Sequence, residues 1–256
     1  MSQVKELKAD KLNVKIYETR IEMGASAAHA VAGRIEELLL KQEFVNVIFA
    51  AAPSQNEFLS SLCNQKVHWD RVNAFHMDEY VGLEENAPQH FGQFLKERIF
   101  DKVPFHEVHY LDGSNANINE ECKRYTQLLQ KYPTDIVCMG IGENAHVAFN
   151  DPHDADFNDP LMVKLVTLDD ASRLQQVHDG CFDRLEDVPE SAITLTVPSL
   201  LRAKSIFCIV PGNKKAQAVY HSVNSKVNED FPSTALREHD DVILYLDKES
   251  AARLKN

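Results

Sequence analysis

The sequence has few features that would place the protein outside a cell, in a membrane or on nucleic acid. Its five cysteines are scattered and form no CxxC pair, so neither a disulfide framework nor a zinc knuckle is indicated. No apolar run reaches the length of a signal-peptide core or a membrane span. Basic residues number 27 against 39 acidic ones, without a dense basic run, which disfavours nucleic acid and anionic lipid. We therefore expect a soluble, cytoplasmic protein with neither nucleic-acid nor membrane partners.

The chain also lacks internal repeats, low-complexity segments and Pro- or Ser-rich linkers. Its 256 residues, 44% of them hydrophobic, are enough to bury one large core. We predict a single domain spanning residues 1–256.

Short apolar segments alternate with longer segments of helical period. Strands are predicted at 12–17, 45–51, 71–77, 135–140, 164–168, 193–197, 205–210 and 242–246, and helices at 24–41, 56–64, 89–100, 119–131 and 214–223. Several of these strands are apolar throughout, as expected when both faces of a sheet are covered. This order predicts an α/β fold with a largely parallel sheet between helices. In such folds ligands bind at the carboxyl ends of the strands.

Two acids stand at the end of the predicted strand 71–77. Asp78 and Glu79 are adjacent, and because successive strand residues point to opposite faces, only one of them should enter a cleft. A carboxylate in a partly dry cleft has a raised pKa and can act as a general base. The alternative is a solvated acidic turn, and this stretch alone does not decide between the two.

A histidine follows the predicted strand 135–140, in the stretch GIGENAHVAFNDP at residues 140–152. Gly140 and Gly142 permit a sharp exit from the strand. His146 can titrate near neutrality, and an acidic neighbour would orient it and raise its pKa. Because Glu143 and Asp151 share its loop, we favour a site of proton transfer over a polar turn.

An anion site is predicted where two helices begin. Ser54 and Glu57 have capping-box spacing, which would start a helix with backbone N–H groups that attract phosphate. The lysines of residues 211–216 would point at the same cleft. Neither signal is specific, because a well-capped helix and a solvated lysine pair are the plain alternatives. The loop at 51–56 also has no glycine with which to cradle a phosphate.

The segment HDADFND at residues 153–159 has the composition of cation ligands, but no second ligand set accompanies it. We expect a polar loop there, no metal site and no cofactor.

Two motifs carry a resemblance to a known family. MDEYVGL at 77–83 and the GxGxxxHxAFNDP frame at 140–152 resemble the glucosamine-6-phosphate deaminase family, also called glucosamine-6-phosphate isomerase. That family shares a superfamily with the 6-phosphogluconolactonases, and the similarity continues through residues 188–219. The resemblance implies a three-layer Rossmann-like fold and an aldose–ketose isomerisation of an amino sugar phosphate that releases ammonia. The substrate would be glucosamine 6-phosphate or a galactosamine 6-phosphate analogue, and homo-oligomers occur in the family.

The resemblance also implies residue roles. Asp78 stands where the family has its C2 base, His146 where it has its ring-opening histidine, and Asp151 where it has the acid that partners this histidine. Lys215 matches the phosphate-binding lysine. The remaining candidates for substrate or phosphate binding are Ser54, Gln55, His178 and Glu79.

The chain departs from the family pattern in ways that concern the substrate. Asn144 replaces an aspartate, so one charge expected to support His146 is missing and this histidine should be less basic. Asp151 replaces a glutamate. The phosphate loop, rich in Thr, Gly and Ser in the family, is AAPSQN at 51–56. The family's phosphate-binding arginine falls near residues 175–178, where Arg173 could substitute.

Two other functions compete with this one. One is that of a lactonase from the sister branch. Lactonases have motifs that resemble DER and DGHxASLFP, where this chain has DEYVG and AFNDP. A sugar-phosphate sensor would bind the ligand without turnover, and its relatives carry a DNA-binding helix-turn-helix before the sensor. The predicted sheet here begins within the first twenty residues and the net charge is −12, which disfavours that class.

Overall fold

The computed structural model describes residues 5–84 and 86–254, which contain a main sheet of eight strands. The strand order is β1-β2-β11-β10-β7-β3-β4-β6, and every neighbouring pair is parallel except the β1–β2 hairpin. The strands are β1 (Lys5–Ala9), β2 (Leu12–Tyr17), β3 (Val45–Phe49), β4 (Val72–His76), β6 (Glu107–His109), β7 (Ile136–Met139), β10 (Ser205–Val210) and β11 (Val242–Asp247).

A second, smaller sheet is antiparallel. It has the order β5-β9-β8 and consists of β5 (Asp78–Tyr80), β8 (Val163–Thr167) and β9 (Ser191–Leu195). The chain passes from the main sheet to this one at Met77, which separates β4 from β5 and whose carbonyl accepts a hydrogen bond from the Leu195 N–H. The residue after Met77 is therefore held near the carboxyl end of the main sheet.

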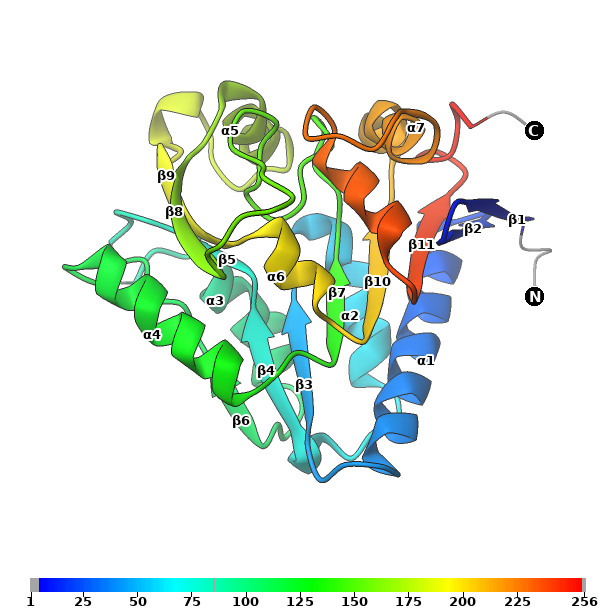
Figure 1. The fold of residues 1–256 in the computed structure, drawn as a ribbon, viewed down its shortest axis with the longest axis horizontal. Coiled ribbons are helices and arrows are strands. Elements are labelled where there is room, and N and C mark those ends of the chain that lie inside the picture. Colours follow the sequence, from blue (N-terminus) through cyan, green and yellow to red (C-terminus); the bar gives the residue numbers. More distant parts are fainter. Residues whose placement is uncertain (1–4, 85, 255–256) are drawn as a thin grey trace.

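Helices cover both faces of the main sheet (Figure 1). They are α1 (Arg20–Leu39), α2 (Asn56–Cys63), α3 (Phe91–Leu95), α4 (Ile118–Lys131), α5 (Asp170–His178), α6 (Val197–Leu201) and α7 (Ala216–Asn224). Shorter helical turns are η1 (Pro53–Gln55), η2 (Trp69–Arg71), η3 (Lys96–Phe100), η4 (Leu185–Asp187), η5 (Asn213–Lys215) and η6 (Pro232–Glu238). In Figure 1, α5 and α7 lie above the arrowheads of β7 and β10, at the carboxyl ends of the strands.

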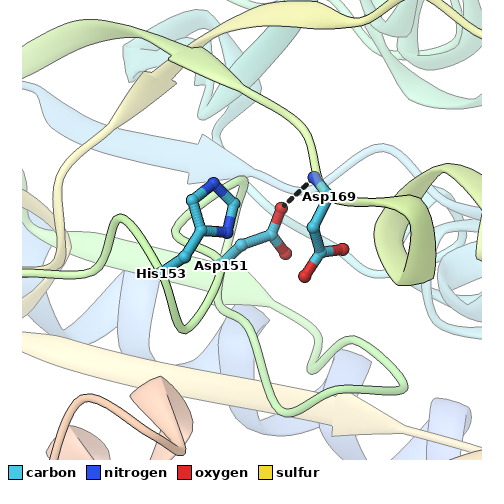
Figure 2. A group of neighbouring side chains, drawn as sticks. All are labelled: Asp151, His153 and Asp169. Atoms are coloured by element: carbon cyan, nitrogen blue, oxygen red, sulfur yellow. Dashed lines mark hydrogen bonds between the residues drawn. The ribbon is translucent and has the colours of Figure 1, made fainter.

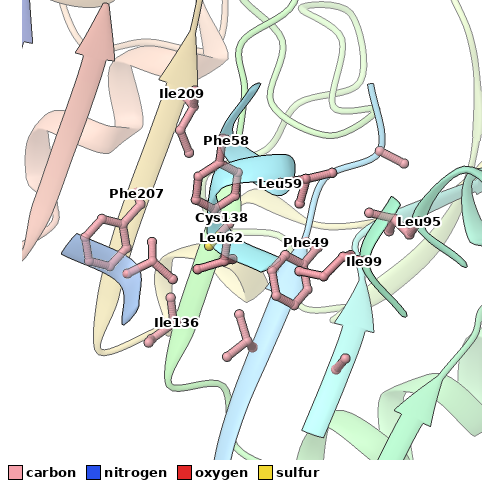
Figure 3. Packing of buried hydrophobic residues seen from close by; sticks show 14 of the residues in the cluster. Phe49, Phe58, Leu59, Leu62, Leu95, Ile99, Ile136, Cys138, Phe207 and Ile209 are labelled. Atoms are coloured by element: carbon pink, nitrogen blue, oxygen red, sulfur yellow. The ribbon is translucent and has the colours of Figure 1, made fainter. Parts of the chain in front are cut away.

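The core consists of two hydrophobic clusters, one on each face of the main sheet. On one face, side chains of α1, α2 and α3 pack against β3, β7 and β10. Figure 3 shows part of this packing, with Phe49 and Phe207 on strands and Phe58 and Leu62 on α2. The other cluster includes residues of α4, α6 and α7. Each large side chain buried in this way contributes about 1.5–3 kcal/mol to folding, so both faces stabilise the sheet.

The predicted fold class is confirmed, because a largely parallel sheet lies between helices. The predicted strands 164–168 and 193–197 form with shifted ends, as β8 and β9, but they belong to the separate antiparallel sheet. Five elements were not predicted: β1, β5, β6, α5 and α6. The three strands are short or charged, and the two helices have five and nine residues, so each carries too little apolar periodicity to detect.

Within the described part of the chain, no helix combines the length and apolar character needed to cross a membrane. The single-domain assignment of residues 1–256 stays a prediction.

Candidate active site

A cleft lies at the carboxyl ends of β3, β4 and β7. Its walls come from segments that follow these strands, from α5 and from the η5 turn, with polar side chains of Ser54, Gln55, Asp78, His146, Gln175, Gln176 and Lys215. The cavity between them is about 60 Å³, enough for a few water molecules.

Asp78 enters the cleft from β5. Its side chain is 7% exposed, and burial raises the pKa of its carboxyl well above the usual range, with a further rise from the nearby Glu79. Burial disfavours the charged form, so the carboxylate gains stability by taking up a proton. A carboxylate in this condition is suited to abstracting a proton from a bound molecule.

Glu79 points away from the cleft, as the alternation of strand side chains predicted for one of the two acids. Its carboxylate accepts hydrogen bonds from the backbone N–H groups of Phe91 and Gly92, at 3.0 and 2.9 Å, and contacts His90 at 3.3 Å. It therefore satisfies the first turn of α3, where a negative charge is favourable. Substrate binding by Glu79 stays a prediction that these contacts do not support.

His76 holds the backbone of Asp78. Its Nδ1 is 2.9 Å from the Asp78 carbonyl oxygen, which can only accept, and its Nε2 accepts from the Leu111 N–H at 2.9 Å. These partners fix a neutral imidazole protonated at Nδ1, and burial lowers its pKa. The sequence analysis did not identify this residue, which lies within the predicted strand 71–77.

His146 lies on a tightly folded loop. The Gly142 N–H donates to the His146 carbonyl at 2.9 Å, and the imidazole lies against Gly142. A Cβ at position 142 would come within 2.2 Å of the imidazole Nε2 atom, which no side chain could tolerate. Two flanking residues, Ala145 and Ala148, have positive φ angles of 70° and 47°, an unfavourable backbone conformation for alanine.

Asp151 lies beside His146, with its Oδ1 atom 3.1 Å from the imidazole Nδ1. The Ser172 hydroxyl also contacts both groups, donating to Asp151 Oδ1 and lying 2.8 Å from His146 Nδ1. Burial alone would raise the pKa of Asp151. Hydrogen bonds from His146, Ser172 and Asn144, together with the charge of His146, instead hold it well below its usual range. Asp151 is therefore ionised and able to orient the histidine.

Asn144 joins two carboxylates. Its amide donates to Asp151 Oδ1 at 3.0 Å and to Asp169 Oδ2 at 3.1 Å, while its own oxygen accepts from the His146 N–H at 3.1 Å. An aspartate at 144 would lack these donors and would add a third negative charge. Asp169 supplies a second carboxylate beside Asn144, and the expected effect of the missing charge at position 144 on His146 stays a prediction.

Lys215 brings a buried cation to the cleft. It is 6% exposed, and burial lowers its pKa to about 8, although Asp179 and Glu143 oppose this shift. Among the described residues its ammonium group makes no hydrogen bond or ion pair. A buried ammonium without a partner is costly, so the cleft favours an anionic ligand.

Ser54 and Gln55 line the cleft, but the predicted capping box does not form. The helix α2 begins at Asn56 with no side-chain cap, and Glu57 instead pairs with Arg20 at 2.7 Å. The Gln55 amide donates to the Ile209 carbonyl at 3.1 Å and to Ser54 Oγ at 3.2 Å. The η1 turn that starts at Pro53 therefore places both side chains at the cleft without a capping role.

The predicted cations near residues 173–178 lie outside the cleft. His178 is exposed and contacts Glu143 at 3.4 Å, while Arg173 donates to the Leu185 and Val188 carbonyls at 3.0 Å. Neither side chain lines the cleft, so the phosphate-binding roles predicted for His178 and Arg173 stay predictions without support from this geometry. Their places are taken by two buried amides, Gln175 and Gln176.

Gln175 accepts a hydrogen bond from the Glu143 N–H at 2.8 Å, which ties α5 to the loop of His146. No such contact engages the Gln176 side chain among the residues described, so its amide is free for a ligand. The sequence analysis placed both glutamines near the family's arginine but gave neither a role.

Asp151, His153 and Asp169 are close enough to share a metal ion, with one atom of each lying within 4.8 Å of the others (Figure 2). These groups have other partners, however. The Asp151 carboxylate accepts the Asp169 N–H at 3.2 Å, and His153 Nε2 donates to the Thr167 carbonyl at 3.1 Å. We assign no metal to this cluster.

The acidic segment 153–159 is a polar loop, as predicted. Lys164 on β8 contacts Asp154 at 2.9 Å and Asp159 at 3.0 Å, so two of its carboxylates are balanced by a side chain of the same protein.

The chain is similar to several known proteins. Residues 18–244 match a family model described as glucosamine-6-phosphate isomerases/6-phosphogluconolactonase. A glucosamine-6-phosphate deaminase of Streptococcus sanguinis is 32% identical over 88% of this chain and 95% of that protein. One from an Exiguobacterium species is 37% identical over 71% and 70%, respectively.

Solved structures show the same fold. A monomeric glucosamine-6-phosphate deaminase superposes with a TM-score of 0.85 at 27% identity, covering 93% of this chain and 98% of that one. A 6-phosphogluconolactonase from Thermotoga maritima gives 0.76 at 20% identity, covering 93% and 100%.

Proposed function

The chain belongs to the family of glucosamine-6-phosphate isomerases and 6-phosphogluconolactonases, and we propose that it is the deaminase-type enzyme of this family. The reaction converts glucosamine 6-phosphate, or its galactosamine analogue, to the ketose phosphate and ammonia. The observation that carries this proposal is the meeting of Asp78, the His146–Asp151 pair and Lys215 at one cleft. The relatives named as deaminases support it.

Each group has a part in this reaction. His146, oriented by ionised Asp151, takes the proton of the sugar's C1 hydroxyl as the ring opens and returns a proton to the ring oxygen. Asp78 then removes the proton from C2, and O1 takes up a proton as the C1–C2 enolamine forms. Asp78 delivers its proton to C1 while the nitrogen gives one up, which leaves the 2-imino form of the ketose. Water adds to the imine carbon and ammonia leaves. No step requires a metal or a cofactor.

Lys215 and the groups around it would hold the phosphate. Ser54 offers a hydroxyl, and Gln176 an amide where the family has an arginine. With one cation in place of two, we expect phosphate to be bound less tightly than in relatives that have the arginine.

Replacing Lys215 by Ala should raise KM for a phosphorylated amino sugar about tenfold, corresponding to about 1–2 kcal/mol for a lost charged hydrogen bond. The KM for the unphosphorylated amino sugar should hardly change. In the wild type, KM should also rise above pH 8, because the free ammonium loses its proton near that pH. Steady-state kinetics of both sugars between pH 6 and 9.5 measure these effects.

Lys214 offers a matched control. It adjoins Lys215 but is exposed, and its ammonium donates to the His178 carbonyl at 3.2 Å outside the cleft. Lys214→Ala should leave both KM values near wild type. Equal losses for the two sugars in Lys215→Ala would show that this lysine does not bind phosphate.

Replacing Asn144 by Asp should move the acid limb of the kcat/KM profile to higher pH. The added negative charge lies beside Asp151 and Asp169 and therefore disfavours loss of a proton from the groups around it. Asn144→Ala, which removes the same donors without adding charge, is the control. An unchanged profile in Asn144→Asp would mean that residue 144 does not tune the histidine.

The proposed function itself is tested with the purified protein and a panel of substrates. Glucosamine 6-phosphate, galactosamine 6-phosphate, the free amino sugars and 6-phosphogluconolactone are each assayed for ammonia, ketose and acid. Ammonia and ketose from an amino sugar phosphate support the deaminase. Acid from the lactone alone would make the chain a lactonase, and binding without turnover would make it a sensor.

We also propose a cytoplasmic location, supported by the five free cysteines. The sequence-based expectation of homo-oligomers stays a prediction, and one structural relative is described as monomeric.

A further inference from the structure

Ser172 lies in the first turn of α5, where its side chain is 1% exposed. Its N–H donates to the Asp169 side chain at 2.7 Å, the N-cap interaction that begins the helix. Its hydroxyl is not used by the helix. It points instead at the catalytic loop, where it contacts both His146 and Asp151.

The chemistry of the three groups fixes the direction of these hydrogen bonds. Asp151 is ionised and can only accept, so the single hydroxyl proton of Ser172 is donated to it. The serine oxygen must then accept from His146, which places a proton on Nδ1. The Nδ1 nitrogen also lies 3.1 Å from Asp151 Oδ1, so two acceptors share its proton. The lone pair of the neutral ring is therefore on Nε2.

The Nε2 atom has no hydrogen-bond partner among the residues that the structure describes, and the imidazole lines the cleft. This arrangement leaves Nε2 as the atom that exchanges a proton with a ligand. Asp151 alone could also hold Nδ1, but one acceptor permits the ring to tilt about that single contact. The second acceptor restricts this tilt.

The position of Ser172 depends on how α5 is attached to the loop. Asp169, the N-cap residue, accepts from the Asn144 amide at 3.1 Å and donates its N–H to Asp151 at 3.2 Å. One turn further on, Gln175 accepts from the Glu143 N–H at 2.8 Å. The start of α5 is thus bound to the loop that carries the histidine.

We propose that Ser172 is a positioning residue, which is brought to the loop by α5 and holds the His146 imidazole with Nε2 toward the cleft. The proposal rests on the proposed function for its kinetic consequence. In the protein without ligand, the tautomer and orientation of the His146 imidazole follow from the contacts alone. Asn144 and Asp169 support the arrangement by fixing the start of α5, which gives a reason for the amide at position 144.

Several charged groups lie around His146 and influence how readily its imidazole gains or loses a proton. Asp151 contacts it directly, and Asp169 acts through Asn144. Asp78 and Lys215 line the same cleft. Glu143, which contacts His178 at 3.4 Å, belongs to the loop itself.

The test compares Ser172→Ala, Ser172→Thr and the control Ser205→Ala. Ser205 is also a buried serine whose hydroxyl donates to a carboxylate, that of Asp241, at 2.6 Å, and it begins β10 at the opposite end of the main sheet from the cleft. The readouts are kcat, KM and the ¹⁵N chemical shifts of the His146 ring nitrogens across pH. Wild type should show a neutral ring protonated at Nδ1.

In Ser172→Ala we expect kcat to fall about ten- to a hundredfold with KM changed less than threefold. The His146 titration should move to lower pH, because the imidazolium has lost an acceptor, and its neutral ring should show a larger share of the Nε2-protonated tautomer. Threonine keeps the hydroxyl and should restore the wild-type tautomer. Ser205→Ala should change melting temperature without moving the histidine signals.

An unchanged tautomer and titration in Ser172→Ala would overturn the proposal whether or not the protein turns over an amino sugar. The same shift in Ser205→Ala would overturn it too, by showing a non-specific effect. If the shift occurs only in Ser172→Ala but the substrate panel yields no ammonia, Ser172 positions His146 and the deaminase assignment alone fails.

Discussion

Asp78→Asn should lower kcat about a thousandfold or more while leaving the protein folded. Asparagine has nearly the same shape as aspartate, but its amide cannot take a proton from C2, so the proposed base is lost. The residual rate would come from the rest of the site. Single-turnover kinetics with an amino sugar phosphate measure the effect, because they separate the chemical step from product release.

The same substitution should not lower stability near neutral pH. The pKa of the wild-type carboxyl is raised in the folded state by burial, so its contribution to stability decreases as pH rises from the ordinary aspartate pKa toward the raised value. Asparagine removes this loss, and the free energy of unfolding at pH 7 should be equal or higher. Urea unfolding at pH 4 and pH 7 measures the difference.

Glu79→Gln is the matched control, since it alters the adjacent acid. It should cost stability because Glu79 binds two N–H groups at the start of α3. Its kcat should stay within about tenfold of wild type, since the catalytic carboxylate remains. If Asp78→Asn turns over at a near-normal rate, Asp78 is not the base.

Gly142→Ala should lower kcat at least about a hundredfold, the second large effect expected. The new methyl group would occupy space that the His146 imidazole now fills, within 2.2 Å of its nitrogen. The imidazole must therefore move away from Asp151 and Ser172. Forcing a methyl group into this packed position should also cost about 1–3 kcal/mol of stability. Kinetics, thermal unfolding and the histidine ¹⁵N signals together measure the displacement.

Gly33→Ala is the control for the added methyl group. Gly33 lies on the exposed side of α1, and a Cβ there would meet nothing within 4 Å. Alanine is a better helix former than glycine, so this variant should gain up to about 1 kcal/mol and keep full activity. Wild-type kcat in Gly142→Ala would contradict the packing of the histidine seen here.

The sequence predicted the sheet and the base because these depend on local patterns. An apolar strand followed by polar residues is visible in the sequence, and this pattern placed Asp78 and His146 just after two strands, which are β4 and β7 with β3 between them in the sheet. The family motifs then related each to a role. The orientation of Glu79 was outside the reach of such patterns, because it is decided by the N-terminus of α3, twelve or more residues away.

The α5 side of the site was harder to predict. His178 and Gln176 are two residues apart on one helix and therefore point in directions about 200° apart. An alignment error of two residues is thus enough to assign a binding role to a surface side chain in place of one that lines the cleft. Ser172 belongs to no motif, and its contact with His146 spans 26 residues. The only local signal was Asp169 three residues before Ser172, the spacing of a helix N-cap, which could have indicated where α5 begins.

The backbone strain at the two alanines near His146 lowers the stability of the protein but accompanies an accurate placement of the histidine. Left-handed backbone at Ala145 and Ala148 costs roughly 1 kcal/mol each, and the loop keeps that shape only because its surroundings hold it, as when the Ala145 carbonyl accepts the Ser233 N–H at 2.9 Å. Glycine would adopt the same angles without strain. Selection for heat tolerance would therefore favour glycine at these positions, and the looser loop would place the histidine less accurately. Thermal endurance and turnover compete here, so a laboratory evolution experiment that rewards only the first would be expected to erode the second.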